Sequence, residues 1–528
     1  MGAISTTTTD TEKLVLETIR ALAADLTQAF KGGHPGTAMG ATAIGFALWH
    51  HLMVYNPKNP NWYASPEPKP YRAHRAGSTT TDWCSPRATR VSSSASNCTS
   101  VATTRGHSML KSSIIIPPVI AAGHPEIEFP GIELTTGLLG RGIANAVGLA
   151  MASKHLAASF NKPDFPIVDN TIWCFTRDGC LQEGVGQEAL SLAGHLGLGN
   201  LVVICDDNSV IATCFTDDTN AKMRAVGFEV IDVEDGTNDL HGIIAALKQA
   251  KRNSILSQTQ KQKPTFVHIR TIIGYGSRKA NSGAAHGAAL GEEEVKILKD
   301  NLQLSREEKF VIPQQVYDYN QSTVPEGADS EARWTALLAN YATAYPELYA
   351  ELIARLTPSP SSSISPSSGS HEEHSAYSLP TEHVALLPPK SQLPSAPQAT
   401  RKTSGIVVQA LAPRFPALML GSADLCESTF VHWDGMKEFQ DPSTGLGYYT
   451  GRQIWYGIRE FAMIGVANGM NAYQNGMIIP ICSSYFQFWL YAAPAARMSA
   501  LQGLRFIGVA THDSIGVGED GPTHQSIA

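Results

Sequence analysis

The sequence predicts an α/β protein whose two domains are each built on a parallel sheet. Helix-like and strand-like segments alternate through the first half of the chain, and the same alternation returns from about residue 399. A Ser/Pro-rich stretch that starts at Thr357 separates the two regions and is typical of a flexible linker. We therefore expect a first domain over residues 1–325, a helical segment and linker over 326–398, and a second domain over 399–528.

The expected elements follow in chain order. Residues 14–30 have the apolar spacing of an amphipathic helix, and residues 181–198 have the pattern of a second helix. Short apolar runs are typical of strands buried in a parallel sheet. They predict strands over residues 171–176, 201–207, 265–274, 417–422 and 504–510.

One stretch of the first domain breaks this order. From Trp62 to about Pro118 the sequence is rich in Ser, Thr, Arg and Pro and has no apolar periodicity at 2 or 3.6 residues. A segment of this composition cannot bury much surface. We expect the first domain to be disrupted at about 62–120.

Composition and charge narrow the function classes. The formal net charge of −7 over 528 residues is too small and too dispersed to indicate a nucleic-acid or anionic-membrane partner. The eight cysteines form no CxxC pair, which argues for a reducing compartment and against a disulfide framework or a zinc site. The first residues lack the apolar core of a signal peptide, and no apolar run reaches membrane-spanning length. We expect a soluble, cytoplasmic protein.

Polar residues follow two of the predicted strands. The strand at 171–176 leads into Arg177, Asp178 and Gly179, and the strand at 201–207 is followed by Asn208. Oxygen ligands at neighbouring strand ends, beside a helix amino terminus, suit a magnesium ion bound to a diphosphate. Taken alone, Asp178 would more often be a turn residue or a helix cap.

The loop near residue 520 is the densest polar segment. THDS and IGVGEDGPTHQ place His512, Asp513, Glu519, Asp520 and His524 close together in sequence, directly after the predicted buried strand at 504–510. Open α/β sheets bind ligands at the carboxyl ends of their strands. The alternative is an acidic, solvated turn, but such a turn needs neither the repeated histidines nor the Gly-Pro frame.

Nine sequence blocks occur in the order found in the transketolase family, which the chain resembles over most of its length. The blocks are KGGHPGTAMGATAIGFALW, AGHPEIEFPGIELTTGLLGRGIANAVGLA, GCLQEGVGQEALSLAGHLGLGNLVVICDDNS, RTIIGYGS, HGAALG, ATRKTSG, GSADL, YGIREFAM and GEDGPTHQ. GGHPG, GHPEIEFPGIE and FQFWLYAAPAARMSALQGLRFIG are more similar to the fungal dihydroxyacetone synthases, or formaldehyde transketolases, than to the pentose-pathway enzymes.

The resemblance implies a fold, an activity and partners. Two parallel-sheet domains of the thiamine-diphosphate-binding type are expected, the second incomplete because this chain ends shortly after THQ. The implied reaction transfers a glycolaldehyde unit from a ketose phosphate such as xylulose 5-phosphate to an aldehyde, and formaldehyde would give dihydroxyacetone. The implied cofactors are thiamine diphosphate and Mg²⁺ or Ca²⁺, bound between the domains of a homodimer. A peroxisomal location would require a C-terminal signal beyond Ala528.

The family's cofactor-binding residues map onto both domains. The resemblance assigns Asp178, Asn208 and the backbone carbonyl of Val210 to the metal, and Gly179 and Glu183 to the diphosphate and the dimer contact. In the second domain, Glu460 matches the glutamate that bonds the N1′ atom of the aminopyrimidine, where a shared proton activates the cofactor. The remaining positions are Asp424 near the thiazolium ring and the aromatics Tyr485, Phe488 and Tyr491 around the aminopyrimidine. An aromatic stripe is also common in a protein core.

The family's substrate-binding residues include several histidines. Those matched here are His34, His124, His286, His512 and His524, which would stabilise the alkoxide and carry protons; a single histidine is more often structural. Arg401 and Ser428 match the groups that hold a sugar phosphate, and Asp520 matches the acid that binds a substrate hydroxyl.

The chain departs from the family pattern at several places. Arg177 replaces the first glycine of GDG, where glycine lets the backbone approach the diphosphate. Leu138 and Arg141 stand in a block that is GPLGQG in the family, and Phe461 follows Glu460 where histidine is common. About a dozen residues are missing after Val210. We hypothesise that part of 62–120 is read in a shifted frame or across a mis-spliced intron.

Two alternatives to an active transketolase-type enzyme stay open. The first is a catalytically inactive, truncated homologue that associates with an intact partner. The second is another thiamine-diphosphate enzyme, such as an oxo-acid dehydrogenase component or deoxyxylulose phosphate synthase. GHPG, GHPE and GEDGPTHQ occurring together weaken the second alternative.

Overall fold

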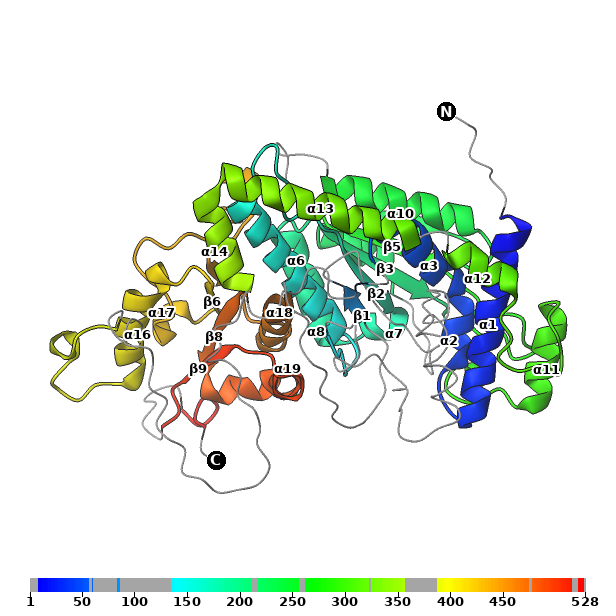
Figure 1. Cartoon of the computed structure of the whole chain (residues 1–528). Helices are drawn as coiled ribbons and strands as arrows, with labels where there is room; N and C mark the ends of the chain where they lie inside the picture. The colour runs from blue at the N-terminus through cyan, green and yellow to red at the C-terminus, as the bar shows by residue number, and fades with distance from the viewer. Residues whose placement is uncertain are drawn as a thin grey trace, which may run out of the picture.

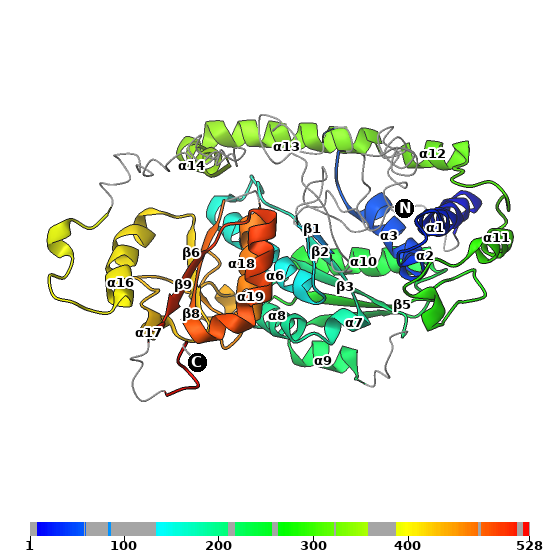
Figure 2. The same ribbon diagram turned by 90° about the horizontal axis from the view of Figure 1, so that it is seen from below.

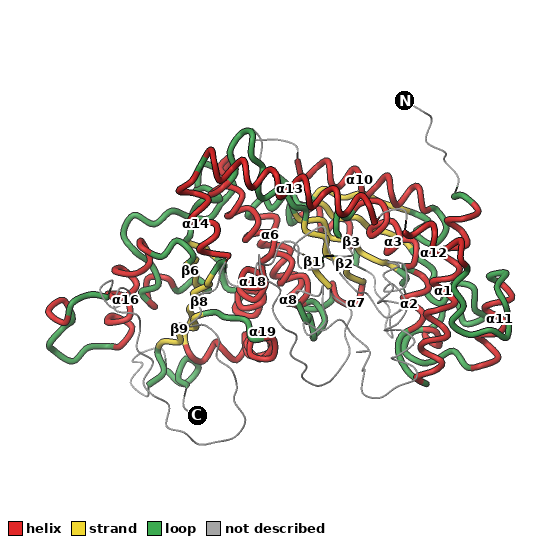
Figure 3. The backbone as a smooth tube through the Cα atoms, in the orientation of Figure 1, coloured by secondary structure: helices red, strands yellow, loops and turns green. Residues whose placement is uncertain are grey.

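Two β-sheets lie side by side, with helices between them and around them (Figures 1 and 2). This computed structural model describes residues 8–56, 59, 83–85, 134–209, 217–255, 262–321, 324–356, 387–473, 477–514 and 521–526. The backbone view in Figure 3 shows the strands inside and the helices outside. Among the helices of these residues, none combines the length and the apolar character needed to cross a bilayer.

The first sheet has the strand order β1-β2-β3-β5-β4. The pairs among β2 to β5 are parallel, and β1 runs antiparallel to β2 at the edge. The strands are β1 (Trp83–Ser85), β2 (Ile172–Arg177), β3 (Leu201–Asp207), β4 (Glu229–Val233) and β5 (Thr265–Arg270). The bounds of β3 are those predicted, while β5 ends four residues before the predicted 274 because the chain enters a turn at residues 273–276.

Alternate side chains of the first sheet enter two different cores. In β2, Ile172 and Cys174 belong to one core, and Trp173 and Phe175 belong to the other. This alternation follows from the two-residue repeat of a strand. Helices therefore cover both faces, as the parallel pairing requires.

The helices of the first domain begin and end at identifiable signals. Residues before the predicted 14–30 are also helical, because Thr9 and Glu12 form a capping box: the Glu12 N–H donates to Thr9 Oγ1 at 3.2 Å and the Thr9 N–H donates to Glu12 Oε2 at 2.8 Å. The helices are α1 (Asp10–Phe30), α2 (Pro35–Gly40), α3 (Thr42–Phe46), a π-helical turn (Ala47–Leu52), α6 (Arg141–Phe160), α7 (Asp178–Leu181), α8 (Gly184–His195), α9 (Thr219–Ala225), α10 (Leu240–Ile255), α11 (Glu292–Asn301) and α12 (Gln314–Gln321).

Two further helices connect the halves of the molecule. They are α13 (Val324–Ala344) and α14 (Pro346–Leu356). Figure 2 shows α13 running along one side of the molecule from the first sheet toward the second. The Tyr341 hydroxyl donates to the Phe160 carbonyl at 2.8 Å, which fixes α13 to the end of α6. The Ser/Pro-rich stretch predicted as a linker lies mostly outside the described residues.

The second sheet has the strand order β7-β6-β8-β9, and all its pairs are parallel. Its strands are β6 (Leu418–Ser422), β7 (Gln453–Trp455), β8 (Ile479–Tyr485) and β9 (Ile507–Thr511). The helices around it are α16 (Thr400–Leu411), α17 (Cys426–Thr429), α18 (Glu460–Ala472) and α19 (Trp489–Gln502). The prediction that residues 504–510 form a buried strand is wrong as regards burial. Within the part of the chain that the structure describes, β9 pairs with β8 alone, at the edge of the sheet, and Ile507 is 47% exposed.

Helices α6 and α18 pack closely between the two sheets. A Cβ on Gly148 would lie 2.0 Å from the carbonyl oxygen of Val466, and one on Gly469 would lie 2.0 Å from that of Asn145. Only glycine allows the two backbones to approach this closely. The Asn145 side-chain amide donates to the Gly465 carbonyl at 2.8 Å. Because α18 begins at Glu460, this packing also sets the position of that carboxyl group.

Candidate functional site

The carboxyl ends of β2 and β3 bring the predicted metal ligands to one edge of the first sheet. Arg177 pairs in register with Asp206, so Asp178 and Asn208 follow at adjacent strand ends. Asp178 and Asn208 are each only 7% exposed. The Gly179 N–H donates to Asp178 Oδ1 at 3.0 Å, and the Asn208 side-chain amide donates to Asp206 Oδ2 at 3.4 Å.

The acids at this edge have different electrostatic environments. Burial raises the pKa of Asp178, and the nearby Asp207 carboxylate adds to the increase. Burial also raises the pKa of Asp206 to about 6, although its side chain accepts a hydrogen bond from the Thr271 hydroxyl. Asp207 accepts from His268 Nε2 at 2.9 Å, and this hydrogen bond lowers its pKa. Asp178 is thus a desolvated carboxylate, which a cation would stabilise.

The donor set fits a hard divalent cation held by few protein ligands. Among the described residues no group of three or more His, Cys, Asp or Glu side chains could hold a metal. The predicted ligands are one carboxylate, one amide and one backbone carbonyl, and Mg²⁺ accepts such oxygen ligands together with phosphate oxygens. Asp178 and Asn208 fit this role by chemistry and by adjacency, whereas Val210 lies outside the described residues.

Two predicted histidines meet beside this edge. The rings of His34 and His286 are 5.8 Å apart between centroids and nearly perpendicular. Gly36 allows the approach of their two loops, since a Cβ there would lie 2.3 Å from the Ala285 carbonyl oxygen. The Gly274 N–H donates to the Gly36 carbonyl at 2.9 Å. Burial lowers the pKa of His34, and the charges of His286 and Arg177 lower it further.

Glu460 lies at the first position of α18 and is 8% exposed. The Ser484 hydroxyl donates to Glu460 Oε1 at 3.5 Å. Burial raises the pKa of this carboxyl group, so it holds a proton at higher pH than an exposed glutamate. Glu188 of α8 accepts from the Ala462 N–H at 3.1 Å, and its pKa is raised by burial and then by Glu460. A protonated carboxyl group can share its proton with a ring nitrogen.

The carboxyl edge of the second sheet gathers further predicted residues. The Arg401 guanidinium donates to the His512 ring, which lies 3.6 Å from the Tyr485 ring between centroids. Tyr485 and Phe488 stack at 5.8 Å, and His524 contacts Phe488 edge-on at 5.3 Å. Tyr485 and Phe488 are only partly buried, so these two aromatics form a surface at the sheet edge and not part of a core.

The other predicted site residues are more exposed or lie outside the description. Ser428 is half-buried in α17, and Asp424 is exposed with a left-handed φ of 60°. Glu183 is exposed at the N-cap of α8, and Tyr491 is 69% exposed. His124, Val210 and Asp520 lie outside the described residues. Among the described residues, the predicted metal ligands thus follow strands of the first sheet, and the Tyr485, Phe488 and His512 group lies at the edge of the second.

The structure accommodates two of the departures from the family pattern. The Arg141 side chain is fully buried and donates to the carbonyls of Thr135 and Thr136. Phe461 packs against the core that contains α6 and α18. Both substitutions are compatible with the packing between the sheets.

Sequence reasoning missed several residues of the site. Asp206 and Thr271 are buried beside Asp178 and Asn208, and Glu188 lies beside Glu460. The two aspartates that end LVVICDD were a sequence signal that could have identified Asp206, because they precede Asn208 directly. The strand register places Asp206 opposite Arg177. Nothing in the sequence distinguished Thr271 or Glu188 from ordinary polar residues.

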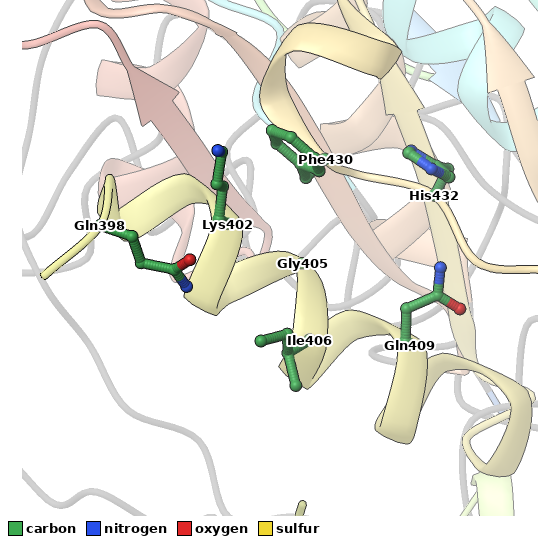
Figure 4. Close-up of a pocket in the computed structure, with 7 residues that line it drawn as sticks. All are labelled: Gln398, Lys402, Gly405, Ile406, Gln409, Phe430 and His432. Atoms are coloured by element: carbon green, nitrogen blue, oxygen red, sulfur yellow. The ribbon is translucent and has the colours of Figure 1, made fainter. Parts of the chain in front are cut away.

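A cavity of about 440 Å³ lies on one face of α16 (Figure 4). Its lining is Gln398, Lys402, Gly405, Ile406, Gln409, Phe430 and His432. Figure 4 shows Phe430 and His432 beside the helix. None of the predicted site residues lines this cavity, although Arg401 directly precedes the lining residue Lys402 in α16.

Comparison with protein families gives two matches. The family described as transketolase, thiamine diphosphate binding domain, matches residues 11–65 and 119–359. The family described as transketolase, pyrimidine binding domain, matches residues 396–528. The unmatched interval 66–118 falls within the Ser-, Thr- and Arg-rich stretch.

Individual relatives and solved structures agree with these matches. The dihydroxyacetone synthase of Candida boidinii is 40% identical over 530 residues, covering 98% of this chain and 69% of the relative. Transketolase 1 of Saccharomyces cerevisiae is 41% identical over 529 residues, covering 98% and 71%. The structure of a Pichia stipitis transketolase complex with sedoheptulose 7-phosphate matches with a TM-score of 0.81 and 35% identity, covering 98% of this chain and 71% of that one. The transketolase from Leishmania mexicana matches with a TM-score of 0.79 and 35% identity, covering 97% and 70%.

Proposed function

The chain belongs to the transketolase family, whose reaction is thiamine-diphosphate-dependent ketol transfer, and we propose that it moves a glycolaldehyde unit from xylulose 5-phosphate to formaldehyde, giving dihydroxyacetone. The Candida boidinii relative is named for dihydroxyacetone synthesis, and the Saccharomyces cerevisiae relative has nearly the same identity to this chain. The choice of formaldehyde as the proposed acceptor therefore rests on the sequence blocks that are more similar to the dihydroxyacetone synthases. Ribose 5-phosphate is the competing acceptor.

The buried Glu460 is the observation that carries this proposal. When bound, thiamine diphosphate supplies a nucleophilic carbon that cleaves the ketose beside its carbonyl group. Glu460 would hold a proton at the N1′ nitrogen of the aminopyrimidine, and burial favours its protonated form. Tyr485 and Phe488, at the same sheet edge as Ser484, would pack against the aminopyrimidine ring.

Other residues would bind and orient the substrate. Arg401 would bind the phosphate of the ketose through its planar fork, and its contact with His512 brings the two groups together. His34 and His286 would move protons to and from the substrate oxygens, because the lowered pKa of His34 keeps its ring neutral and able to accept.

The metal would be Mg²⁺ or Ca²⁺, held by Asp178, Asn208 and the carbonyl of Val210. Oxygen ligands bind both ions, and the small number of protein ligands suits Mg²⁺, which keeps phosphate oxygens and waters in its shell. Asp178→Ala is expected to abolish metal-dependent binding of thiamine diphosphate in a calorimetric titration of the full chain. Unchanged affinity would refute the assignment.

A homodimer would bring the two sheet edges of different subunits together. In one chain Asp178 and Asn208 follow strands of the first sheet, whereas Glu460 begins a helix of the second domain. Large apolar side chains of the second domain are exposed: Ile458, two residues before Glu460, at 78%, and Leu490 and Tyr491, at the start of α19, at 69% each. Exposed apolar groups of this kind are typical of a surface that a partner covers.

An inactive homologue is the second candidate. The observation that favours it is the unmatched interval 66–118 within the first domain. Binding of thiamine diphosphate together with ketol transfer separates the two candidates. Sequencing the transcript across this interval tests the shifted-frame hypothesis, and an unbroken message encoding these residues would refute it.

Cytoplasmic location stays a prediction that imaging of a fluorescent fusion can test.

A further inference from the structure

We propose that the cavity on one face of α16 binds a small planar aromatic monocarboxylate, with the carboxylate at Lys402 and the ring against Phe430. The cavity has a volume of about 440 Å³, which lies within the size range of small-molecule sites. Its described lining includes none of the residues assigned to the metal, the cofactor or the substrate. A ligand here would therefore bind in addition to those of the proposed function.

Helix α16 builds one wall of the cavity. Four lining residues share one face of the helix because they are three or four positions apart: Lys402, Gly405, Ile406 and Gln409. Gly405 leaves the centre of this face without a side chain, and a Cβ there would lie 2.8 Å from the Cβ of Phe430. Phe430 can therefore pack directly against the helix backbone.

The segment that follows α17 builds the other wall. Phe430 and His432 present near-parallel rings, 6.5 Å apart between centroids and inclined by 21°. Figure 4 shows both rings on the same side of α16 as Lys402. Phe430 has a left-handed φ of 58°, which is rare for a bulky residue and is a conformation that clusters at ligand-binding sites. Two flat ring faces favour a planar aromatic ligand over a branched aliphatic one.

Two polar groups of the lining lack a partner that a carboxylate would supply. Among the described residues, Lys402 forms no ion pair, and the Nδ1 atom of His432 is buried without a hydrogen-bond partner. A buried polar atom without a partner costs free energy, so a ligand oxygen that accepts from it gains affinity. The two oxygens of a carboxylate can accept from both groups.

The charges around the cavity favour a ligand with a single negative charge. The described lining contains no Asp or Glu, and Lys402 is its one ammonium group. Asp434 lies beyond the other end, where its N–H donates to Gln409 Oε1 at 2.9 Å. Lys402 and Gln409 are about 10 Å apart along the helix axis, so Asp434 repels negative charge only at the far end. One lysine balances one carboxylate, whereas a phosphate would carry further charge without a partner.

Calorimetric titration of the full chain tests the proposal, in an excess of thiamine diphosphate and Mg²⁺. The probe is naphthoate, and two matched probes separate its features. Naphthalenemethanol keeps the aromatic rings without the charge, and decahydronaphthoate keeps the charge without the flat rings. The variants are Lys402→Met, Lys402→Arg, Phe430→Leu and His432→Phe. Lys437→Met is the matched control, because Lys437 is an exposed lysine of the same domain that does not line the cavity.

We expect the wild type to bind naphthoate more tightly than either matched probe. Lys402→Met should weaken naphthoate binding about tenfold, which is the loss of one charged hydrogen-bonding group, and Lys402→Arg should lose less. Binding of naphthalenemethanol should be the same in Lys402→Met as in the wild type. Phe430→Leu and His432→Phe should each weaken naphthoate binding by about 2- to 10-fold. Lys437→Met should bind naphthoate as the wild type does.

Four outcomes would overturn the proposal. Absence of naphthoate binding by the wild type at millimolar concentration would show that the cavity is not a site for this ligand class. Unchanged binding by both Lys402→Met and Phe430→Leu would place the ligand elsewhere. An equal loss in Lys437→Met would show unspecific attraction to surface charge. Binding that disappears when thiamine diphosphate is added would make naphthoate a competitor for the cofactor.

Discussion

Replacing Gly469 by alanine tests the packing that positions Glu460. Gly469 lies in α18 where the helix crosses α6, and the added Cβ would lie 2.0 Å from the Asn145 carbonyl oxygen and 3.0 Å from its Cα atom. Ordinary contacts of a Cβ begin near 3.4 Å. Because the obstructing atoms belong to the backbone, the two helices would have to separate by roughly an ångström.

The expected cost follows from the contacts that this separation disturbs. Overpacking of a close-packed core costs about 1–3 kcal/mol. Separation would also stretch the hydrogen bond from the Asn145 amide to the Gly465 carbonyl, which contributes about 1 kcal/mol. We expect Gly469→Ala to lower the free energy of unfolding by about 2–4 kcal/mol.

Urea unfolding followed by circular dichroism measures this change, with Gly184→Ala as the control. Gly184 begins α8, and a Cβ there would meet no atom within 4 Å. The control should be as stable as the wild type or slightly more stable, since alanine favours a helix over glycine. If Gly469→Ala unfolded at the same urea concentration as Gly184→Ala, the close packing of α6 and α18 would be refuted.

Two further predictions concern stability and assembly. His155 is buried, and its ring nitrogen Nδ1 donates to the Tyr449 carbonyl at 3.0 Å. Burial lowers the pKa of this histidine to about 4. As the pH falls from 6.5 toward 4, the unfolded chain therefore binds a proton that the folded chain does not. Over this pH window the free energy of unfolding should fall by about 3 kcal/mol in the wild type and by clearly less in His155→Gln. Urea titrations of both proteins at about pH 7 and about pH 4.5 measure this fall. An equal fall in the two proteins would contradict the account. Ile458→Asp puts a charge on an exposed apolar position two residues before Glu460, so it should shift the chain from dimer to monomer. Sedimentation velocity measures this shift. An unchanged dimer would place the interface elsewhere.

The sequence predicted three strands of the first sheet, β2, β3 and β5, because these segments are mainly apolar, whereas β1 and β4 were not predicted. The limits of β3 agree with the prediction, and β2 differs by one residue at each end. The burial of β9 was not predictable in the same way. An apolar run indicates a strand, but only the strand order shows that β9 lies at the edge with Ile507 exposed.

The site was predictable where a motif places a residue at a strand end, and not where it depends on packing. Asp178 and Asn208 follow adjacent parallel strands, so their proximity followed from the pattern. The partners of Glu460 could not be predicted, because Glu188 and Ser484 reach it only after α8, α18 and β8 have packed. The direction of the Arg177 side chain likewise depends on the position of Thr37 in α2.

Ketol transfer measured with and without the Glu460 carboxylate tests the central claim most directly. The full chain would be assayed with xylulose 5-phosphate as donor and with formaldehyde or ribose 5-phosphate as acceptor, in saturating thiamine diphosphate and Mg²⁺, beside Glu460→Gln. We predict turnover by the wild type that is faster with formaldehyde, and a loss of at least about 100-fold in Glu460→Gln, because the amide cannot carry the proton to N1′. Wild-type turnover by Glu460→Gln would contradict the assigned role of Glu460, and no turnover by a wild type that binds thiamine diphosphate would contradict the proposed activity.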